Sequence, residues 1–266
     1  MEILEYRNIR LELDNQLATV VLADPERLNA MSTDMAEDIM RALQEIGKPR
    51  RAIRALLLRG EGRGFCAGAN LAGRGPDASG NLPVLSRVES CYHPLIARMR
   101  AFDRPIVVAV HGACVGVGLA MALQCDCIVA SRDAYFSTPF VKLGSGPDGG
   151  LTWMLPRFIG PFRARQMLMQ LKRVTAQEAL EWGMVSEVLP EEGFVEAAKA
   201  IAEGFAAGPT IALSEIRQLL RDSLRQDFAS HLDDESRALA RTFRSKDNRE
   251  GMRAFASKTQ PVFTGE

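Results

Sequence analysis

Apolar and polar residues follow two different patterns along the chain, and the change falls near residue 160. Before that point, short apolar runs rich in β-branched residues predict buried strands. These runs cover residues 17–22, 54–59, 106–110 and 127–130. An apolar stripe from Met35 to Ile46 has helical spacing, and Ser32 stands where it could cap that helix. Because strands alternate with helices, we expect an α/β fold with a largely parallel sheet.

After residue 160 almost every pattern is helical. Pro161 predicts a helix start, and Thr175 to Glu178 has the spacing of a capping box whose helix ends at Gly183. Two amphipathic helices are predicted over residues 194–205 and 211–224, and a short strand over 185–189. The last fifty residues carry well-spaced apolar positions and predict helices that need a partner surface. These positions are Leu232, Leu239, Phe243, Met252 and Phe255.

The composition excludes several classes of protein. Lysine plus arginine equals aspartate plus glutamate at 33 each, and a formal net charge of zero argues against a nucleic-acid surface. The start of the chain lacks the pattern of a signal peptide, and no apolar run reaches the ~18 residues of a membrane span. We therefore expect a cytoplasmic protein with no nucleic-acid or membrane partner. An odd number of cysteines in mostly apolar settings favours reduced core thiols: Cys66, Cys91, Cys114, Cys125 and Cys127.

Two glycine-bearing turns each follow a predicted buried strand. The first is GEGRGFCAGANL, residues 60–71, and the second is HGACVGVGLAMAL, residues 111–123, with a helix beginning near Gly118. At such turns backbone N–H groups are unpaired, and small residues let a ligand approach them closely. Two N–H groups that converge would form an oxyanion hole for a polarised carbonyl. The alternative is a pair of ordinary tight turns. A dinucleotide fingerprint is excluded because its third glycine is missing.

One aspartate stands at the entrance to an apolar segment. Asp148 lies in SGPDGGLTW, residues 145–153, between glycines that leave its backbone nearly unrestrained. A carboxylate beside an apolar stretch is a candidate general base. The alternative is a cap for the helix that follows.

Five stretches together carry a family resemblance: PERLNAMS (25–32), GFCAGANL (64–71), RPIVVAVHGACVGVGLAMALQCD (104–126), FVKLGSGPDGGLTWMLPRFIG (140–160) and TAQEALEWGMVSEV (175–188). In this order they resemble the crotonase, or enoyl-CoA hydratase/isomerase, family. The resemblance implies a crotonase-type spiral of repeated ββα units over residues 1–200 and a C-terminal helical trimerisation region over residues 201–266. It also implies an acyl-CoA thioester substrate, a homotrimer or dimer of trimers, and no metal or redox cofactor.

The resemblance also assigns roles to individual residues. The backbone N–H groups of Ala69 and Val117 match the two oxyanion-hole donors, and Asp148 matches a catalytic base. Phe255 and Lys258 match residues that reach the coenzyme A of a neighbouring subunit. The remaining substrate- and coenzyme-binding candidates are Arg27, Leu28, Ala30, Cys66, Ala67, Gly68, Asn70, Leu71, Gly118, Ala120 and Phe140.

The chain departs from the family where hydratases carry their two glutamates. Ala120 and Phe140 stand at these positions, and neither side chain can transfer a proton. Asp148 alone matches the base of dienoyl-CoA and epoxyphenylacetyl-CoA isomerases. We therefore predict an acyl-CoA isomerase in which Asp148 shuttles the proton. Ala120 is expected to leave space, and Phe140 to form an aromatic wall, for a flat or bulky acyl group.

Two alternatives stay open. His93 resembles a histidine of the aryl-CoA dehalogenase branch, where it would activate water against an intermediate on Asp148. It is otherwise a surface or packing histidine. Because both hydratase glutamates are absent, the protein could instead bind acyl-CoA without turning it over.

Overall fold

The computed structural model describes residues 1–71 and 87–266, and a seven-stranded sheet forms its centre. The strands β3, β4, β5, β7 and β10 run parallel, and β1, β2 and β3 are antiparallel. Their order across the sheet is β1 (Glu2–Glu5), β2 (Ile9–Asp14), β3 (Leu17–Leu22), β4 (Ala55–Gly60), β5 (Ile106–Val110), β7 (Cys127–Ser131) and β10 (Glu187–Leu189). The four strands expected in the first part of the chain are confirmed as β3, β4, β5 and β7.

A second, smaller sheet stands beside the first. It contains β6 (Ala113–Val115), β8 (Tyr135–Ser137) and β9 (Val174–Thr175). The chain therefore runs twice from a strand of the large sheet to a strand of the small one and then into a helix. These two units end in α4 (Val117–Ala122) and α5 (Leu151–Gln170). This repetition confirms the predicted spiral of ββα units.

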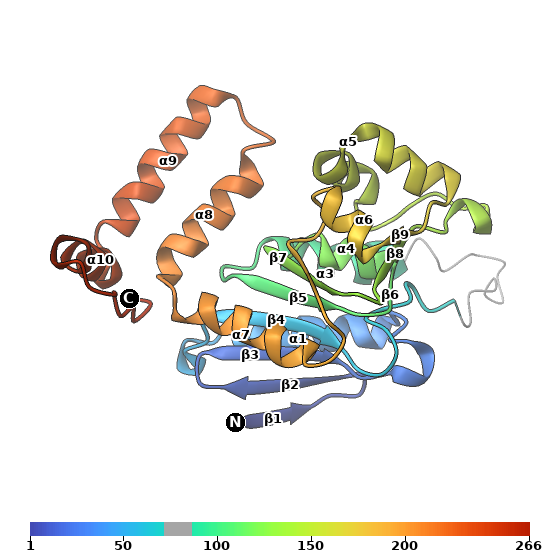
Figure 1. Cartoon of the computed structure of the whole chain (residues 1–266), viewed down its shortest axis with the longest axis horizontal. Coiled ribbons are helices and arrows are strands. Elements are labelled where there is room, and N and C mark those ends of the chain that lie inside the picture. Colours follow the sequence, from blue (N-terminus) through green and yellow to red (C-terminus); the bar gives the residue numbers. More distant parts are fainter. Residues whose placement is uncertain (72–86) are drawn as a thin grey trace.

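Helices cover both faces of the large sheet (Figure 1). On one face lie α1 (Thr33–Ile46) and α3 (His93–Arg100). On the other lies α7 (Phe194–Ala207), whose alanines at every fourth position, Ala198, Ala202 and Ala206, pack against β4 and β5. Small side chains at this spacing bring the helix axis close to the sheet. In the described residues, no helix is both long and apolar enough to span a bilayer.

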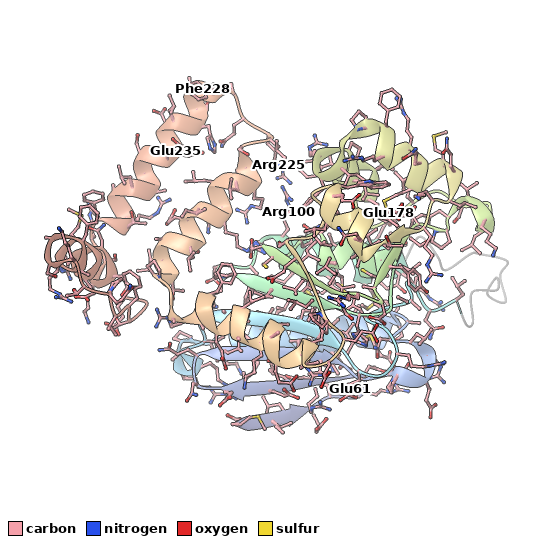
Figure 2. The ribbon with its side chains drawn as sticks, viewed as in Figure 1. Glu61, Arg100, Glu178, Arg225, Phe228 and Glu235 are labelled. Carbon is pink, nitrogen blue, oxygen red and sulfur yellow. The ribbon has the colours of Figure 1, made fainter. Side chains whose placement is uncertain are left out.

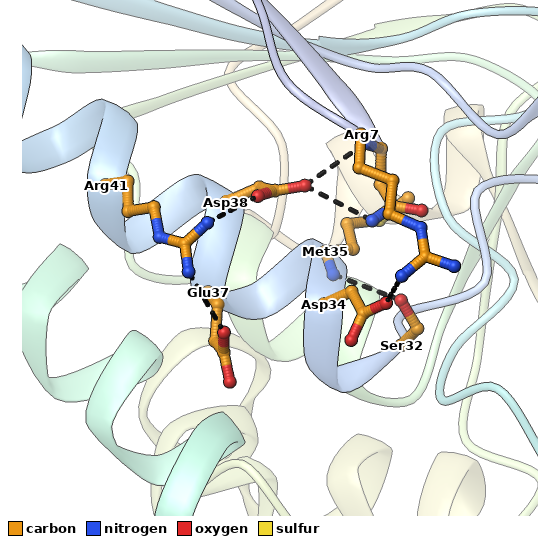
Figure 3. A network of polar contacts seen from close by, with 8 residues as sticks. Arg7, Ser32, Asp34, Met35, Glu37, Asp38 and Arg41 are labelled. Carbon is orange, nitrogen blue, oxygen red and sulfur yellow. Dashed lines mark hydrogen bonds and ion pairs between the residues drawn. The ribbon is translucent and has the colours of Figure 1, made fainter.

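Polar contacts fix the start of α1 to the turn between β1 and β2 (Figure 3). The Ser32 hydroxyl accepts a hydrogen bond from the Met35 N–H at 3.0 Å, which confirms the predicted cap. Asp38 is 4% exposed, and its carboxylate accepts the Asn8 N–H at 3.1 Å. Arg7 pairs with Asp34 in the first turn of the helix. The beginning of α1 is therefore fixed independently of its apolar face.

The helix predicted to start at Pro161 is the second half of α5. Gly160, with φ 78° and ψ 160°, breaks the helix into two segments. The capping box at Thr175 is confirmed, because its hydroxyl accepts the Glu178 N–H and the Glu178 carboxylate accepts the Thr175 N–H. The capped helix is α6 (Ala176–Glu181), and Gly183 follows it with φ 75°.

The C-terminal helices α8 (Thr210–Asp222), α9 (Phe228–Thr242) and α10 (Lys246–Ser257) extend from one side of the sheet (Figure 1). The proposed boundary at residue 200 falls inside α7, whose last turns still pack on the sheet. The division into two regions stays a prediction. The C-terminal helices expose several large apolar side chains, namely Ile216, Leu220, Phe228, Leu232, Leu239, Phe243, Met252 and Phe255.

After α10 the chain turns back to the sheet. Arg54, which is 6% exposed and precedes β4, donates to the Phe263 carbonyl at 3.0 Å. The buried Asp247 carboxylate accepts the N–H groups of Thr264 at 2.7 Å and Gly265 at 2.9 Å. We call these contacts the tail clasp. They hold the last residues against both α10 and the start of β4.

Candidate functional site

The first glycine-bearing turn follows β4 and joins the small sheet. The Cys66 N–H donates to the Ala113 carbonyl at 2.8 Å, and the Val115 N–H donates to the Cys66 carbonyl at 2.9 Å. The first turn therefore lies directly beside β6, which is part of the second turn. The two segments that the sequence predicted to act together are hydrogen-bonded neighbours.

Met31 holds the other side of the first turn. The Met31 N–H donates to the Gly68 carbonyl at 2.7 Å, and the Asn70 N–H donates to the Met31 carbonyl at 2.8 Å. These two bonds form a parallel bridge between Met31 and the residue that separates Gly68 from Asn70. In a parallel bridge this middle residue directs its own N–H away from the opposite strand, here from Met31. That residue is Ala69. Within residues 1–71 and 87–266, the Ala69 N–H donates to no recorded acceptor.

The second candidate donor stands at the beginning of α4. The Val117 N–H lies in the first turn of this helix and has no recorded acceptor in the described part of the chain. Gly116, with φ 51°, directs the chain into the helix. A Cβ on Gly118 would stand 2.7 Å from the Cys66 Cβ. Only glycine at 118 therefore lets the start of α4 lie this close to the first turn.

Phe140 borders both turns. A Cβ on Gly116 would lie 3.7 Å from the Phe140 ring and 3.9 Å from the Gly68 Cα. Phe140 is half-buried and immediately precedes the short helix η4 (Val141–Leu143). The ring thus stands where the two turns meet, and its role as an aromatic wall for the acyl group stays a prediction.

The segment that carries Asp148 packs on α4. Gly149, with φ 62°, lies so close to Ala120 that an added Cβ would come within 2.6 Å of the Ala120 Cβ. Ala120 follows Val117 by about one helical turn, so the Asp148 backbone lies near the second candidate donor. Asp148 itself is half-buried. The structure thus brings Asp148, the start of α4 and the first turn into one region.

One alternative and one expectation about this region are wrong. The cap residue of α5 is Gly150, with φ 79° and no side chain, so Asp148 does not cap that helix. The space expected at Ala120 is filled, because Gly149 packs on its methyl group and Ala120 is fully buried. The small residue at 120 accommodates the Asp148 segment, and it does not by itself enlarge the acyl pocket.

The predicted coenzyme wall follows the short helix η1 (Pro25–Arg27). Arg27 is exposed and pairs with Asp24 at 3.3 Å, while Leu28 and Ala30 are half-buried. The Ala67 N–H donates to the Leu28 carbonyl at 2.9 Å, which joins this wall to the first turn. Leu71, 49% exposed, continues the first turn at its outer end.

Asn29 was not singled out from the sequence, although it connects these two segments. It is fully buried with φ 53°, a backbone conformation that asparagine tolerates better than most residues. Its side-chain oxygen accepts the Asp24 N–H at 2.9 Å. Its amide nitrogen donates to the carbonyls of Glu61 at 2.9 Å and Gly64 at 2.8 Å. The sequence offered one clue to this role, because Asn29 stands between Leu28 and Ala30, which were both predicted to bind the substrate.

Three predicted residues are not brought into the same region. His93 is exposed at the first position of α3, and no contact between His93 and Asp148 is recorded among the described residues. Phe255 is 85% exposed, and Lys258 follows α10 at the end of the molecule away from α4 (Figure 1). A role for these two residues at the site would need a second chain, and it stays a prediction.

The buried thiols do not form a reactive or metal-binding centre in the described part of the chain. Burial raises the pKa of Cys66 to about 11. This thiol therefore stays protonated near neutral pH and fills space between the two turns. The described residues contain no group of three or more histidine, cysteine and acidic side chains placed to hold a metal ion.

A positively charged cavity of about 270 Å³ lies between α3, α5 and α8, and no sequence pattern pointed to it. Two guanidinium groups lie over the Trp153 ring, Arg157 at 3.9 Å and Arg100 at 4.8 Å from its centroid. Burial, with the nearby charges of Arg225 and Arg221, lowers the pKa of Arg100. Figure 2 shows Arg100 and Arg225 beside the gap between the C-terminal helices and α5. Apart from Leu123, at the end of the second segment, no residue that lines this cavity belongs to the two turns.

Comparisons with known proteins identify the class. The model of the enoyl-CoA hydratase/isomerase family matches residues 12–266. The 1,2-epoxyphenylacetyl-CoA isomerase of Escherichia coli (strain K12) is 37% identical over 255 residues, covering 96% of this chain and 97% of that protein. A probable enoyl-CoA hydratase of Rhodobacter capsulatus is 34% identical over 262 residues, covering 98% and 100%. An enoyl-CoA hydratase structure from Bacillus anthracis superposes with a TM-score of 0.90 at 29% identity, covering 98% and 100%.

The chain therefore belongs to the enoyl-CoA hydratase/isomerase family, whose members act on acyl-CoA thioesters. This confirms the family resemblance carried by the five sequence stretches. The relatives include both isomerases and hydratases, so family membership alone leaves the reaction to be argued from the residues.

Proposed function

We propose that this protein is an acyl-CoA isomerase that works through a thioester enolate, with Asp148 as the group that moves the proton. The product is a shifted double bond or a rearranged epoxide of the epoxyphenylacetyl-CoA type. The observation that carries the proposal is the packing of Gly149 on Ala120. It puts the Asp148 segment against α4, beside the position at which hydratases carry a glutamate.

The mechanism uses two backbone donors and one carboxylate. The thioester oxygen would accept hydrogen bonds from the N–H groups of Ala69 and Val117. Asp148 removes a proton from the α-carbon, and the electron pair moves onto the oxygen to give the enolate. The protonated Asp148 then returns the proton at the γ-carbon as the carbonyl re-forms. Each donor aimed at the developing charge is worth about 3 kcal/mol of transition-state stabilisation.

Hydration is the less favoured reaction because it needs additional proton-transferring groups to deliver water. At the two positions in question the chain offers the methyl group of Ala120, buried under Gly149, and the ring of Phe140. The isomerisation above is complete with one base and two N–H donors. We therefore propose that no metal or redox cofactor takes part.

We further propose that the wall formed by Arg27, Leu28 and Ala30 binds the coenzyme A part of the substrate. This binding surface would extend along the first turn to Ala67 and Leu71. Phe255 and Lys258 would complete the coenzyme site of a neighbouring copy in a homotrimer or a dimer of trimers. The exposed apolar side chains of the C-terminal helices support this assembly, because isolated helices rarely leave so many large apolar groups in water.

Exchange of α-protons with deuterated solvent tests the reaction, because it reports enolate formation whatever the product is. We expect exchange with at least one member of a panel of 3-enoyl- and aryl-acyl-CoA thioesters. Asp148→Asn keeps the shape of the side chain but cannot take up the proton, so exchange should fall by about 10²-fold or more. The control is Asp103→Asn, the same chemical change at an exposed site.

The panel also separates the alternatives. Full exchange in Asp148→Asn would contradict the role of that carboxylate. Halide release from a 4-halobenzoyl-CoA would favour the dehalogenase mechanism with His93. No turnover and no exchange of any thioester by the unaltered protein, despite measurable binding, would favour a non-catalytic acyl-CoA binder.

A further inference from the structure

A rare helical turn places a tyrosine against Met31, the residue that bonds to the first turn of the candidate oxyanion hole. The π-helical turn η3 (Val88–Tyr92) leads directly into α3. Such turns insert an extra residue and occur frequently at functional sites. Tyr92, the last residue of the turn, is 2% exposed, whereas the adjacent His93 faces solvent. The Tyr92 hydroxyl donates a hydrogen bond to the Met31 carbonyl at 2.9 Å.

The Met31 carbonyl has a second donor, and that donor belongs to the oxyanion turn. It accepts the Asn70 N–H at 2.8 Å, while the Met31 N–H donates to the Gly68 carbonyl at 2.7 Å. Met31 is fully buried, so its carbonyl and N–H have no water as a ready substitute partner. The peptide of Met31 therefore fixes the residues on both sides of Ala69.

We propose that Tyr92 is a positioning residue for the oxyanion hole, and the inference rests on the function proposed above. Its hydroxyl fixes the orientation of the Met31 carbonyl. The carbonyl in turn fixes the Asn70 N–H and hence the direction of the Ala69 N–H. Tyr92 need not touch the substrate for this, because the effect passes through two hydrogen bonds.

The effect should appear mainly in the rate of the chemical step. The oxygen gains its full negative charge only in the enolate, so a misdirected N–H costs more in the transition state than in the bound thioester. Of the two bonds recorded for this carbonyl among the described residues, removal of the hydroxyl leaves the one from Asn70, so the carbonyl can tilt. We expect kcat to fall about tenfold, since small displacements of a group that stabilises the transition state have effects of this order or larger. KM should change less than about twofold, because ground-state binding is nearly untouched.

A purely structural role is the competing explanation, because Tyr92 also belongs to the apolar cluster that includes Met31 and Met35. Tyr92→Phe separates the two roles, since it keeps the ring and removes only the oxygen. The matched control is Tyr135→Phe, which removes a hydroxyl from the half-buried β8 tyrosine whose ring stacks under Arg173 at 3.3 Å.

The experiment combines kinetics with amide hydrogen exchange on the full chain. For Tyr92→Phe we expect the lower kcat, a nearly constant KM, and faster exchange of the Asn70 and Met31 amides. The Tyr135→Phe control should match the unaltered protein in all three. Unchanged kcat in an active Tyr92→Phe protein would overturn the inference, and so would unchanged protection of both amides.

The two proposals fail in different ways. If the unaltered protein forms no enolate with any thioester, the proposed function is wrong. The amide measurement still decides then whether Tyr92 fixes the turn. If the unaltered protein is active and Tyr92→Phe lowers kcat and protection across the whole molecule equally, the role of Tyr92 is structural and the positioning inference is wrong.

Discussion

Replacement of Asn29 by aspartate tests how the predicted coenzyme wall is joined to the oxyanion turn. The two side chains have nearly the same shape, but aspartate has an oxygen where asparagine has its amide nitrogen. That nitrogen donates to the carbonyls of Glu61 at 2.9 Å and Gly64 at 2.8 Å. The change would therefore remove two hydrogen bonds and place a charged oxygen against two carbonyl oxygens.

The magnitude follows from these contacts and from complete burial of Asn29. Each lost hydrogen bond with a buried partner costs about 1–1.5 kcal/mol. Burial of a charge without a cation adds to this, so we expect Asn29→Asp to lower the free energy of unfolding by at least about 3 kcal/mol. For a chain of this size, that corresponds to a drop in Tm of about 6–12 °C.

Thermal and urea unfolding of the variant at pH 7 measure the effect. Asn15→Asp is the matched control, because Asn15 also has φ 53° but is exposed in the turn between β2 and β3. Asn15→Asp should change the free energy of unfolding by no more than about 0.5 kcal/mol, as other surface substitutions do. If the two variants lose the same stability, the Asn29 side chain does not connect the two segments as described.

Two further predictions concern the C-terminal helices. The Arg253 guanidinium, with the Val262 N–H, lowers the pKa of Glu250 from 4.5 to about 2, so its stabilising effect is present above pH 4.5 and is lost as the pH falls through about 2. Acid unfolding followed by circular dichroism should therefore show Glu250→Gln less stable than the unaltered protein at pH 5 and equal to it near pH 2. An equal difference at both pH values would contradict this account. The particle mass should be three or six times the 29.2-kDa chain mass, and Leu239→Glu with Phe243→Glu should reduce it, whereas a monomeric unaltered protein would exclude the trimer.

The sequence alone located β3, β4, β5 and β7 because apolar residues make up most of each strand, which lies between two covered faces. It did not locate β1 and β2, although in β2 the charged residues Arg10 and Glu12 alternate with apolar ones in the pattern of a half-buried strand. It also missed the strands of the small sheet, which are only two or three residues long. Runs this short carry no usable periodicity.

The candidate site likewise contains residues that the sequence alone revealed and residues that it did not. Asp148, Ala69 and Val117 stand in glycine-rich turns, and both the turns and the family motifs are visible in the sequence. Asn29 and Tyr92 act through hydrogen bonds to distant backbone carbonyls, and Tyr92 is 61 positions away from Met31. No local pattern reveals such a contact. The packing of the Asp148 segment on α4 likewise joins residues that are far apart in the sequence, Gly149 and Ala120.

The tail clasp has a practical consequence for handling the protein. Arg54 and Asp247 hold residues 263–265 by their backbone atoms, so the last residues are part of the folded structure. A reporter or affinity peptide fused after Glu266 would begin directly beside the clasp. The side chains of β1 are mostly exposed, which makes the opposite terminus the safer attachment point for labels and immobilisation.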